Sequence, residues 1–254
     1  MDVSTERWNQ FLTELKNVNK HLRIEDLIYS INLSLRNKYI YVETPKVGCS
    51  TIKKMLIQGE YGKKINFTDP AYIHLREFSP LLNIKQVDNF SEFVKRGDMF
   101  KFCFVRNPYT RLLSAYLDRI KSNKPKKRQI IIQNADRYLS GEGLSFSEFV
   151  DAIVEQPIMY MDIHWRVQYY QTFQEGIKYD FIGKFETFKK DLGYAIEKTG
   201  IDFQKFYEEV RPHATNAEEY IQKYYVPELA KKIYNKYRVD FEYFGYEEEL
   251  QRGV

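Results

Sequence analysis

Residues 41–54 read YVETPKVGCSTIKK, and residues 102–116 read FCFVRNPYTRLLSAY. Each stretch has the pattern of an apolar strand, a tight loop and the first turns of a helix. In each, cationic and hydroxyl side chains follow the strand, where the first N–H groups of a helix have no partner within it and attract anions. Together the two stretches predict a protein that holds one ligand by two phosphate groups.

The composition is that of an ordinary globular protein. The chain has 254 residues, of which 43% are hydrophobic and 29% are charged, and its formal net charge is +4. This balance gives no reason to expect nucleic-acid binding, but it is compatible with an anionic ligand. The aromatic share of 16% fits a tyrosine-rich core and surface, or alternatively aromatic walls around a base or a sugar ring.

The cysteines and the N-terminus indicate a protein that does not depend on an oxidising compartment. Cys49 and Cys103 form neither a metal-ligand spacing nor a disulfide framework. The first ten residues, MDVSTERWNQ, are polar and charged, and no apolar run reaches 18 residues. We therefore expect a soluble, cytoplasmic protein without a transmembrane segment.

Strand and helix patterns alternate along the chain, which predicts an α/β domain with a largely parallel central sheet. The run 99–105 is apolar throughout, as in a strand that is buried on both faces. Strands are also predicted over 28–35, 38–43 and 179–185. Helices are predicted over 5–18, from Ser50 to about Gln58, within 83–96, over 109–121, after a capping box of Ser145 and Glu148, over 187–199, and from Asn216 and near Pro227.

The first motif is an anion-binding loop of an uncommon kind. Gly48 permits a backbone that a side chain would block, Ser50 and Thr51 add hydroxyl donors, and Lys46 adds a full charge. The lysine precedes the glycine, unlike in the G-x-x-x-x-G-K-[ST] loop of ATP- and GTP-binding proteins. This order argues against a kinase or NTPase. The alternative is an ordinary turn between a strand and a helix.

The second motif places an arginine at the end of a buried strand. Arg106 needs an anionic or hydrogen-bonding partner there, and a phosphate can accept two parallel bonds from its guanidinium. Pro108 suits the first helical position, and Ser114 follows on the helix. The alternative is a structural pair between Arg106 and a carboxylate.

The two motifs, in this order, resemble those of the carbohydrate sulfotransferases of family 2, which use 3′-phosphoadenosine-5′-phosphosulfate (PAPS). The similarity runs from about residue 38 to residue 246 and includes residues 162–168, 179–186, 213–217 and 240–246. Asn107 and Val167 depart from the Asp and Pro that are usual in the branch acting on Golgi glycans. The absence of an anchor pattern suggests a soluble, bacterial-type member.

The resemblance implies a fold, a donor and a set of site residues. We expect one sulfotransferase domain over residues 1–254, with a P-loop NTPase-like three-layer α/β/α fold. The 5′-phosphosulfate is expected at Lys46, Val47, Gly48, Cys49, Ser50 and Thr51, and the 3′-phosphate at Arg106 and Ser114. No metal is expected, and the acceptor is expected to be a sugar or a glycolipid, not a nucleic acid.

Catalysis needs stabilisation of the leaving charge and a base for the acceptor proton. Lys46 is the candidate for the first role. The resemblance favours His74 as the base, with His164 and Glu186 as alternatives; His164, Arg166 and Glu186 are also candidates for binding the acceptor. His21 and His213 are expected to be structural.

Acceptor specificity is expected in loops 63–98 and 121–144, of which residues 121–128 form a basic stretch or simply a solvated loop. Two other functions stay open. One is a nucleotide-dependent phosphotransferase with an atypical phosphate loop, and the other is a non-catalytic module that binds a nucleotide or a glycan.

Overall fold

The structure is a computed structural model, and it describes Thr13 and residues 23–87, 90–121, 144–208 and 215–250. Contacts divide the chain into two compact units: Met1–Val105 with Tyr170–Pro212, and Arg106–Tyr169 with His213–Val254. The predicted helix over residues 5–18 lies outside the described residues, Thr13 excepted. One domain over residues 1–254 stays a prediction.

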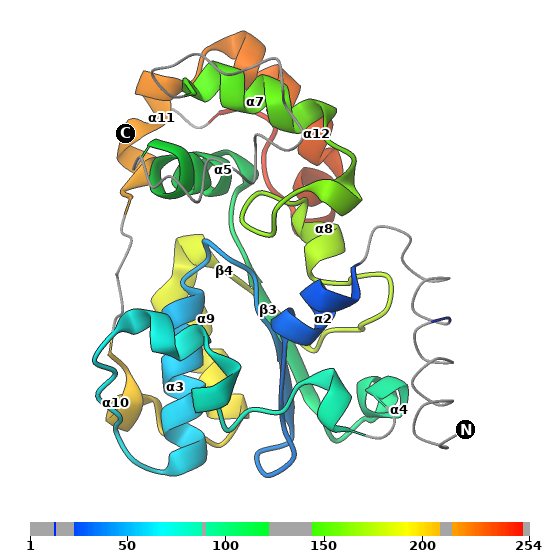
Figure 1. The fold of residues 1–254 in the computed structure, drawn as a ribbon, viewed down its shortest axis with the longest axis vertical. Helices are drawn as coiled ribbons and strands as arrows, with labels where there is room; N and C mark the ends of the chain where they lie inside the picture. Colours follow the sequence, from blue (N-terminus) through cyan, green and yellow to red (C-terminus); the bar gives the residue numbers. More distant parts are fainter. Residues whose placement is uncertain (1–12, 14–22, 88–89, 122–143, 209–214, 251–254) are drawn as a thin grey trace. The chain divides into compact units, whose positions relative to one another are not determined.

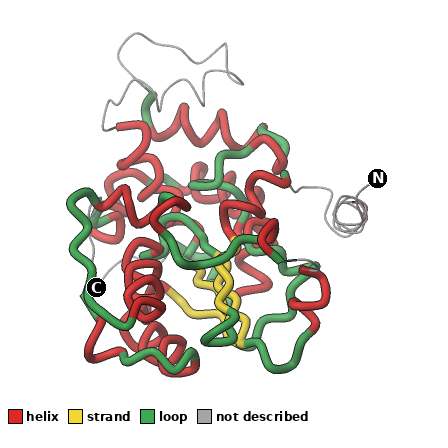
Figure 2. Tube along the Cα trace, turned by 60° about the horizontal axis from the view of Figure 1, so that its bottom comes forward, coloured by secondary structure: helices red, strands yellow, loops and turns green. Residues whose placement is uncertain are grey.

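A four-stranded sheet in the order β1-β2-β3-β4 forms the centre of the first unit. β1 (Ile31–Ser34) pairs antiparallel with β2 (Tyr39–Val42), while β3 (Phe100–Val105) runs parallel to both β2 and β4 (Phe181–Lys184). Figure 2 shows the strands side by side. The predicted α/β class with a mainly parallel sheet is therefore confirmed.

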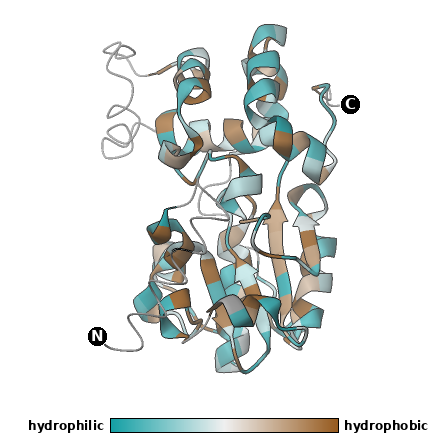
Figure 3. Cartoon of the chain, turned by 90° about the vertical axis from the view of Figure 1, so that its right-hand side faces the viewer, coloured by the Kyte–Doolittle hydropathy of each residue, from teal (hydrophilic) through white to brown (hydrophobic). Residues whose placement is uncertain are grey.

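Helices cover both faces of this sheet, because alternate strand residues point to opposite sides. Tyr41 and Phe102 pack in a cluster with α3 (Cys49–Tyr61) and α9 (Phe188–Lys198). Val42 and Cys103 pack in a second cluster with residues of α2 (Ile24–Ser30) and α4 (Phe90–Lys95). Figure 1 shows the two pairs of helices on opposite sides of the strands, whose ribbons are largely brown, for hydrophobic, in Figure 3.

Several boundaries of the first unit differ from the predictions. Residues 28–30, predicted as strand, are the end of α2. Arg76 explains this, since its Nη2 donates to the carbonyls of Ile28, Tyr29 and Ile31 and so caps the helix from a distant part of the sequence. The predicted helix within 83–96 is divided into η3 (Ile84–Gln86) and α4. The predicted helix after Ser50 is confirmed, and ends at Tyr61 before a left-handed Gly62.

The remaining elements of the first unit are short. They are η1 (Pro70–His74), η2 (Arg76–Phe78), η6 (Phe185–Thr187) and α10 (Phe203–Phe206), and α8 (Gln168–Gln171) bridges the sequence boundary between the units.

The second unit is helical where it is described. Its elements are α5 (Pro108–Tyr116), the π-helix η4 (Leu117–Lys121), α7 (Phe146–Glu155), η5 (Ile158–Tyr160), α11 (Ala217–Tyr224) and α12 (Pro227–Phe244). The capping box at Ser145 and the helix start at Pro227 are both confirmed. The predicted helix over 109–121 is α-helical only to Tyr116, and the basic stretch after Lys121 lies outside the described residues.

Aromatic rings form the core of the second unit. The Tyr116 ring packs against Phe146 and Phe149, and Phe149 packs edge-on against Trp165, with centroids 5.2 to 5.6 Å apart. Such pairs add to the stabilisation that their buried area gives. The aromatic share of the composition therefore serves packing here, as the first of its two interpretations predicted.

Candidate active site

The loop between β2 and α3 has the geometry of an anion-binding loop. Its last residue, Gly48, has φ +82°, and α3 begins at Cys49. Among the described residues, no side chain caps this helix start, and its first turn has no acidic residue. The positive end of the helix is thus left for an external anion.

Glycine is required at position 48 for two reasons. A Cβ there would lie 2.6 Å from the ring of Phe188, and φ +82° disfavours any other residue. The predicted need for a glycine is confirmed. Around it, Val47 and Thr51 are buried, whereas Cys49 and Ser50 are partly exposed.

Lys46 has φ +71°, which is unusual for a residue with a side chain. Such backbone strain costs on the order of 1–3 kcal/mol and clusters at ligand-binding sites. The side chain of Lys46 is partly exposed. Its conformation is consistent with the charge-stabilising role, which stays a prediction.

His74 joins the loop to the end of β2. Its Nε2 lies 2.8 Å from Ser50 Oγ, and its Nδ1 lies 2.9 Å from Glu43 Oε1. An ionised carboxylate only accepts hydrogen bonds, so Nδ1 carries a proton, and Nε2 of the neutral ring accepts from the Ser50 hydroxyl. The structure thus places a basic nitrogen at a hydroxyl of the loop.

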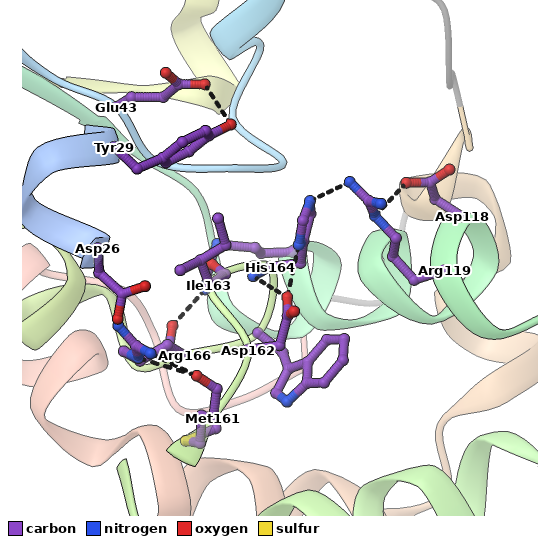
Figure 4. A network of polar contacts seen from close by, with 12 residues as sticks. Asp26, Tyr29, Glu43, Asp118, Arg119, Met161, Asp162, Ile163, His164 and Arg166 are labelled. Carbon is purple, nitrogen blue, oxygen red and sulfur yellow. Dashed lines mark hydrogen bonds and ion pairs between the residues drawn. The ribbon is translucent and has the colours of Figure 1, made fainter. Parts of the chain in front are cut away.

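Glu43 is a fully buried carboxylate with three partners. Besides accepting from His74, it lies 3.0 Å from Lys53 Nζ and accepts from the Tyr29 hydroxyl at 3.4 Å, as Figure 4 shows for Tyr29. Burial by itself raises the pKa of Glu43, but the ammonium of Lys53 and the bond from His74 outweigh it and lower the pKa to about 2. Glu43 is therefore an anion throughout the neutral range, and it fixes the orientation of the His74 ring by accepting from its Nδ1.

The segment that carries His74 is held in place at three points. The side chain of Asp69 accepts from the backbone N–H of Ala71 and so caps the start of η1. Ile73 is buried, with 1% of its surface exposed. Arg76 binds the end of α2, from which Tyr29 reaches Glu43. His74 is thus positioned by contacts that do not depend on a ligand.

Three potential metal ligands lie close together at this site: an atom each of Glu43, Cys49 and His74, all within 4.8 Å of one another. Catalytic zinc ions are commonly bound by three protein ligands. Lys53 already neutralises this carboxylate, and burial together with the charge of Glu43 raises the pKa of Cys49 to about 12. A metal ion would have to displace both the ammonium and the thiol proton. The cluster is better suited to proton transfer, and the absence of a metal stays a prediction.

Arg106 and Ser114 belong to the second unit, where each has a polar partner. Arg106 is buried, its Nη2 donates to Glu218 Oε1 at 2.5 Å, and its Nε donates to Thr110 Oγ1 at 3.1 Å. Ser114 is buried and accepts from the Thr215 hydroxyl at 2.9 Å. The sequence left open a structural pair between Arg106 and a carboxylate, and the structure contains one. That carboxylate, however, is 53% exposed.

The side chain of Gln168 holds the backbone of Arg106 in place within the second unit. Its N–H donates to Gln168 Oε1 at 2.9 Å, and Gln168 Nε2 donates back to its carbonyl at 2.8 Å. Asn107 accepts from the N–H of Tyr109 and so caps α5. The amide of Asn107 thus fills the capping role that an aspartate would fill.

His164 lies in a different polar network of the second unit (Figure 4). Its Nδ1 lies 2.6 Å from Asp162 Oδ1, and its Nε2 faces the guanidinium of Arg119, which lies 3.2 Å from Asp118. Burial raises the pKa of Asp162, but the bonds from His164 outweigh it and lower the pKa. Asp162 thus accepts from a protonated Nδ1, and Nε2 accepts from an arginine that does not release its proton.

Two candidates for acceptor binding, Arg166 and Glu186, differ in burial and belong to different units. Arg166 is 1% exposed and donates through Nε and Nη2 to the carbonyl of Met161. Arg111 fixes the same segment through the carbonyls of Ile163 and Arg166. Glu186 is exposed in η6 of the first unit. The acceptor-binding roles of His164, Arg166 and Glu186 stay predictions; His21 and His213 lie outside the described residues.

Sequence reasoning missed Glu43, Lys53, Thr215 and Glu218. Glu43 carried a usable signal, because a charged residue at the end of a buried strand needs a partner, as was inferred for Arg106. Lys53 stands among buried apolar residues of α3, which also demands an anion. Thr215 lies in the segment 213–217 that carries part of the resemblance, but neither it nor Glu218 signalled a need for a polar partner, since hydroxyl and acidic residues are ordinary at a helix start.

A model of the Sulfotransferase family matches residues 29–247. The chain belongs to this family. It is 28% identical over 243 residues to carbohydrate sulfotransferase 14 of Danio rerio, a match that covers 89% of this chain and 64% of the relative. It is 29% identical over 237 residues to carbohydrate sulfotransferase 9 of Homo sapiens, covering 83% and 52%.

The chain is also 27% identical over 235 residues to carbohydrate sulfotransferase 11 of Mus musculus. This match covers 83% of the chain and 65% of the relative. The chain thus spans between 52% and 65% of the length of these three relatives. No solved structure matches it. Within the described residues, no helix of this family member is both long and apolar enough to cross a membrane.

Proposed function

We propose that this chain transfers a sulfuryl group from PAPS to a hydroxyl of a carbohydrate or glycoconjugate. The observation that carries the proposal is the row of contacts Ser50–His74–Glu43, which places a basic nitrogen beside an anion-binding loop. Family membership and the names of the relatives, all carbohydrate sulfotransferases, support the same reaction and acceptor class.

The loop of the first unit is proposed to bind the 5′-phosphosulfate. The N–H groups at the start of α3 would donate to its oxygens, with the hydroxyls of Ser50 and Thr51 and the charge of Lys46. The left-handed Lys46 and Gly48 support this, because they turn the chain sharply before the helix. The strand–loop–helix order and the helices on both faces of the sheet support the finer proposal of a P-loop NTPase-like three-layer fold.

The second unit is proposed to bind the 3′-phosphate through Arg106 and Ser114. A buried guanidinium binds phosphate oxygens strongly, because its charge is poorly screened. The Ser114 hydroxyl accepts from Thr215 and retains its own proton for a phosphate oxygen. The 3′-phosphate distinguishes PAPS from ATP, so this pair would determine the choice of donor.

His74 is proposed as the general base. Its Nε2 takes the proton of the acceptor hydroxyl while the acceptor oxygen forms a bond to sulfur and the bond from sulfur to the 5′-phosphate oxygen breaks. Glu43 stabilises the imidazolium that results, and Lys46 stabilises the charge on the leaving phosphate. PAPS supplies the activated sulfuryl group when it is bound.

The geometry favours His74 over His164 for this role. Nε2 of His164 faces Arg119, which holds its proton, whereas the contact of His74 Nε2 within the described residues is with the Ser50 hydroxyl, which can rotate away. The same contacts argue against a non-catalytic module, because simple binding requires no base that is held by a buried carboxylate.

A comparison of nucleotides tests the proposal for the donor. Adenosine 3′,5′-bisphosphate should raise the unfolding temperature, while ADP and ATP–Mg²⁺ should raise it less. Transfer of labelled sulfate from PAPS to a panel of sugars, glycolipids and simple phenols then tests the reaction. Preferential binding of ATP–Mg²⁺ with phosphate transfer would instead establish the phosphotransferase.

The cellular setting is proposed from the sequence alone. We propose a cytoplasmic protein that needs no metal and takes a sugar or glycolipid, not a nucleic acid, as acceptor. Cell fractionation, and transfer assays with and without EDTA, are the direct tests.

A further inference from the structure

Arg106 and its partner Glu218 differ sharply in burial. The side chain of Arg106 is 4% exposed, while that of Glu218 is 53% exposed. Arg106 Nη2 lies 2.5 Å from Glu218 Oε1. A buried charge requires a counter-ion, but an exposed carboxylate can leave for solvent at little cost in solvation. Arg106 is therefore a fixed cation, and Glu218 is a partner that can be replaced.

The second contact of the predicted phosphate pair comes from the same short segment. Thr215 donates to Ser114, Asn216 is left-handed with φ +45°, and α11 begins at Ala217. The side chain of Asn216 makes no capping bond to α11. Glu218, in the first turn of α11, thus provides the negative charge that both this helix start and Arg106 favour.

We propose that Glu218 occupies the place on Arg106 that the donor's 3′-phosphate takes, and so acts as an internal competitor that sets the affinity for the donor. This inference rests on the proposed function. A carboxylate and a phosphate offer the same oxygen acceptors to a guanidinium, and a phosphate adds more negative charge. When the phosphate binds Arg106, the carboxylate of Glu218 moves into solvent.

Thr215 is the companion of this exchange. Its hydroxyl donates to Ser114 while Glu218 covers Arg106, and it can rotate to donate to a phosphate oxygen instead. Ser114 can donate its own proton to the same phosphate. Among the residues that the structure describes, the anion site of the second unit thus includes the buried cation of Arg106, the hydroxyls of Ser114 and Thr215, and the replaceable anion of Glu218.

The test compares Glu218→Gln with Glu219→Gln. Both variants remove one charge from the first turn of α11, but no contact joins Glu219 to Arg106; Glu219 lies 3.5 Å from Asn216. Affinities for adenosine 3′,5′-bisphosphate and for 5′-AMP, which lacks the 3′-phosphate, are measured by calorimetry. Thermal unfolding of the free variants verifies that they are folded.

Glu218→Gln should tighten binding of the bisphosphate by roughly three- to tenfold, because a larger fraction of molecules then has Arg106 open to the ligand. Binding of 5′-AMP should not change, and Glu219→Gln should behave as the wild type with both ligands. Weaker binding of the bisphosphate in Glu218→Gln, or no change, overturns the inference.

Arg106→Ala separates this failure from failure of the proposed function. If the wild type binds the bisphosphate and Arg106→Ala does not, the phosphate site stands, and the two glutamine variants decide the inference alone. If the wild type does not bind the bisphosphate, the proposed donor is wrong, and the inference falls with it.

Discussion

Replacing Glu43 by glutamine leaves Lys53 as a buried cation without its counter-ion. The two charges are 3.0 Å apart, and both side chains are 0% exposed. At an effective dielectric constant of about 20, the Coulomb attraction at this distance is roughly 5–6 kcal/mol. Much of it offsets the cost of burying the pair, but removing one partner of such a pair typically costs about 3–5 kcal/mol.

We therefore expect Glu43→Gln to lower the free energy of unfolding by about 3–5 kcal/mol, a large part of the roughly 5–15 kcal/mol of a typical protein. Lys53→Met should also destabilise the protein, because it leaves the carboxylate buried. The double variant removes both charges and should recover most of the stability. Urea denaturation followed by circular dichroism measures all four proteins in one cycle.

Sulfuryl transfer should not recover with stability. The double variant still lacks the carboxylate that stabilises a protonated His74, so its turnover should stay at least about tenfold below the wild type. Two results would refute this reasoning: Glu43→Gln within about 1 kcal/mol of the wild type, or a double variant no more stable than either single one. Normal turnover in the stable double variant would remove Glu43 from the proposed mechanism.

Three further predictions concern the loop and the base. His74→Ala should lower turnover by roughly 10²–10⁴-fold and leave the affinity for adenosine 3′,5′-bisphosphate unchanged, because it removes the base and no donor contact; normal rates would move the base to His164 or Glu186. Lys46→Met keeps the length of the side chain and should abolish transfer without unfolding the protein, as measured by the label transferred from PAPS to the acceptor and by circular dichroism. Gly48→Ala should lower the free energy of unfolding by about 1–2 kcal/mol, since φ is +82°; unchanged stability in denaturation would contradict the loop geometry.

Local patterns predicted the strands of the central sheet, although the strand predicted over residues 28–35 included the end of α2. The apolar run before Arg106 predicted β3, and the run before Glu43 predicted β2, because buried parallel strands leave a continuous apolar signal. The end of α2 could not be predicted in this way. It depends on Arg76, a residue nearly fifty positions away, which binds the carbonyls of Ile28 and Tyr29.

The candidate site was predictable in its loop, but not in its supporting contacts. Gly48 and the helix start followed from chain geometry, since a left-handed turn before a helix favours glycine. The link from Ser50 through His74 to Glu43 joins three segments whose spacing in the sequence carries no signal. Likewise, a carboxylate was an open alternative for Arg106, but its identity as Glu218 required the structure.

The measurement that tests the central claim most directly is transfer of radiolabelled sulfate from PAPS by the purified wild type, Lys46→Met and His74→Ala, each with a panel of sugar and glycolipid acceptors. The account predicts a labelled acceptor and adenosine 3′,5′-bisphosphate in equal amounts with the wild type, and neither above background with Lys46→Met. A protein that binds the bisphosphate but labels no acceptor, or that transfers sulfate equally well without Lys46 and His74, would contradict it.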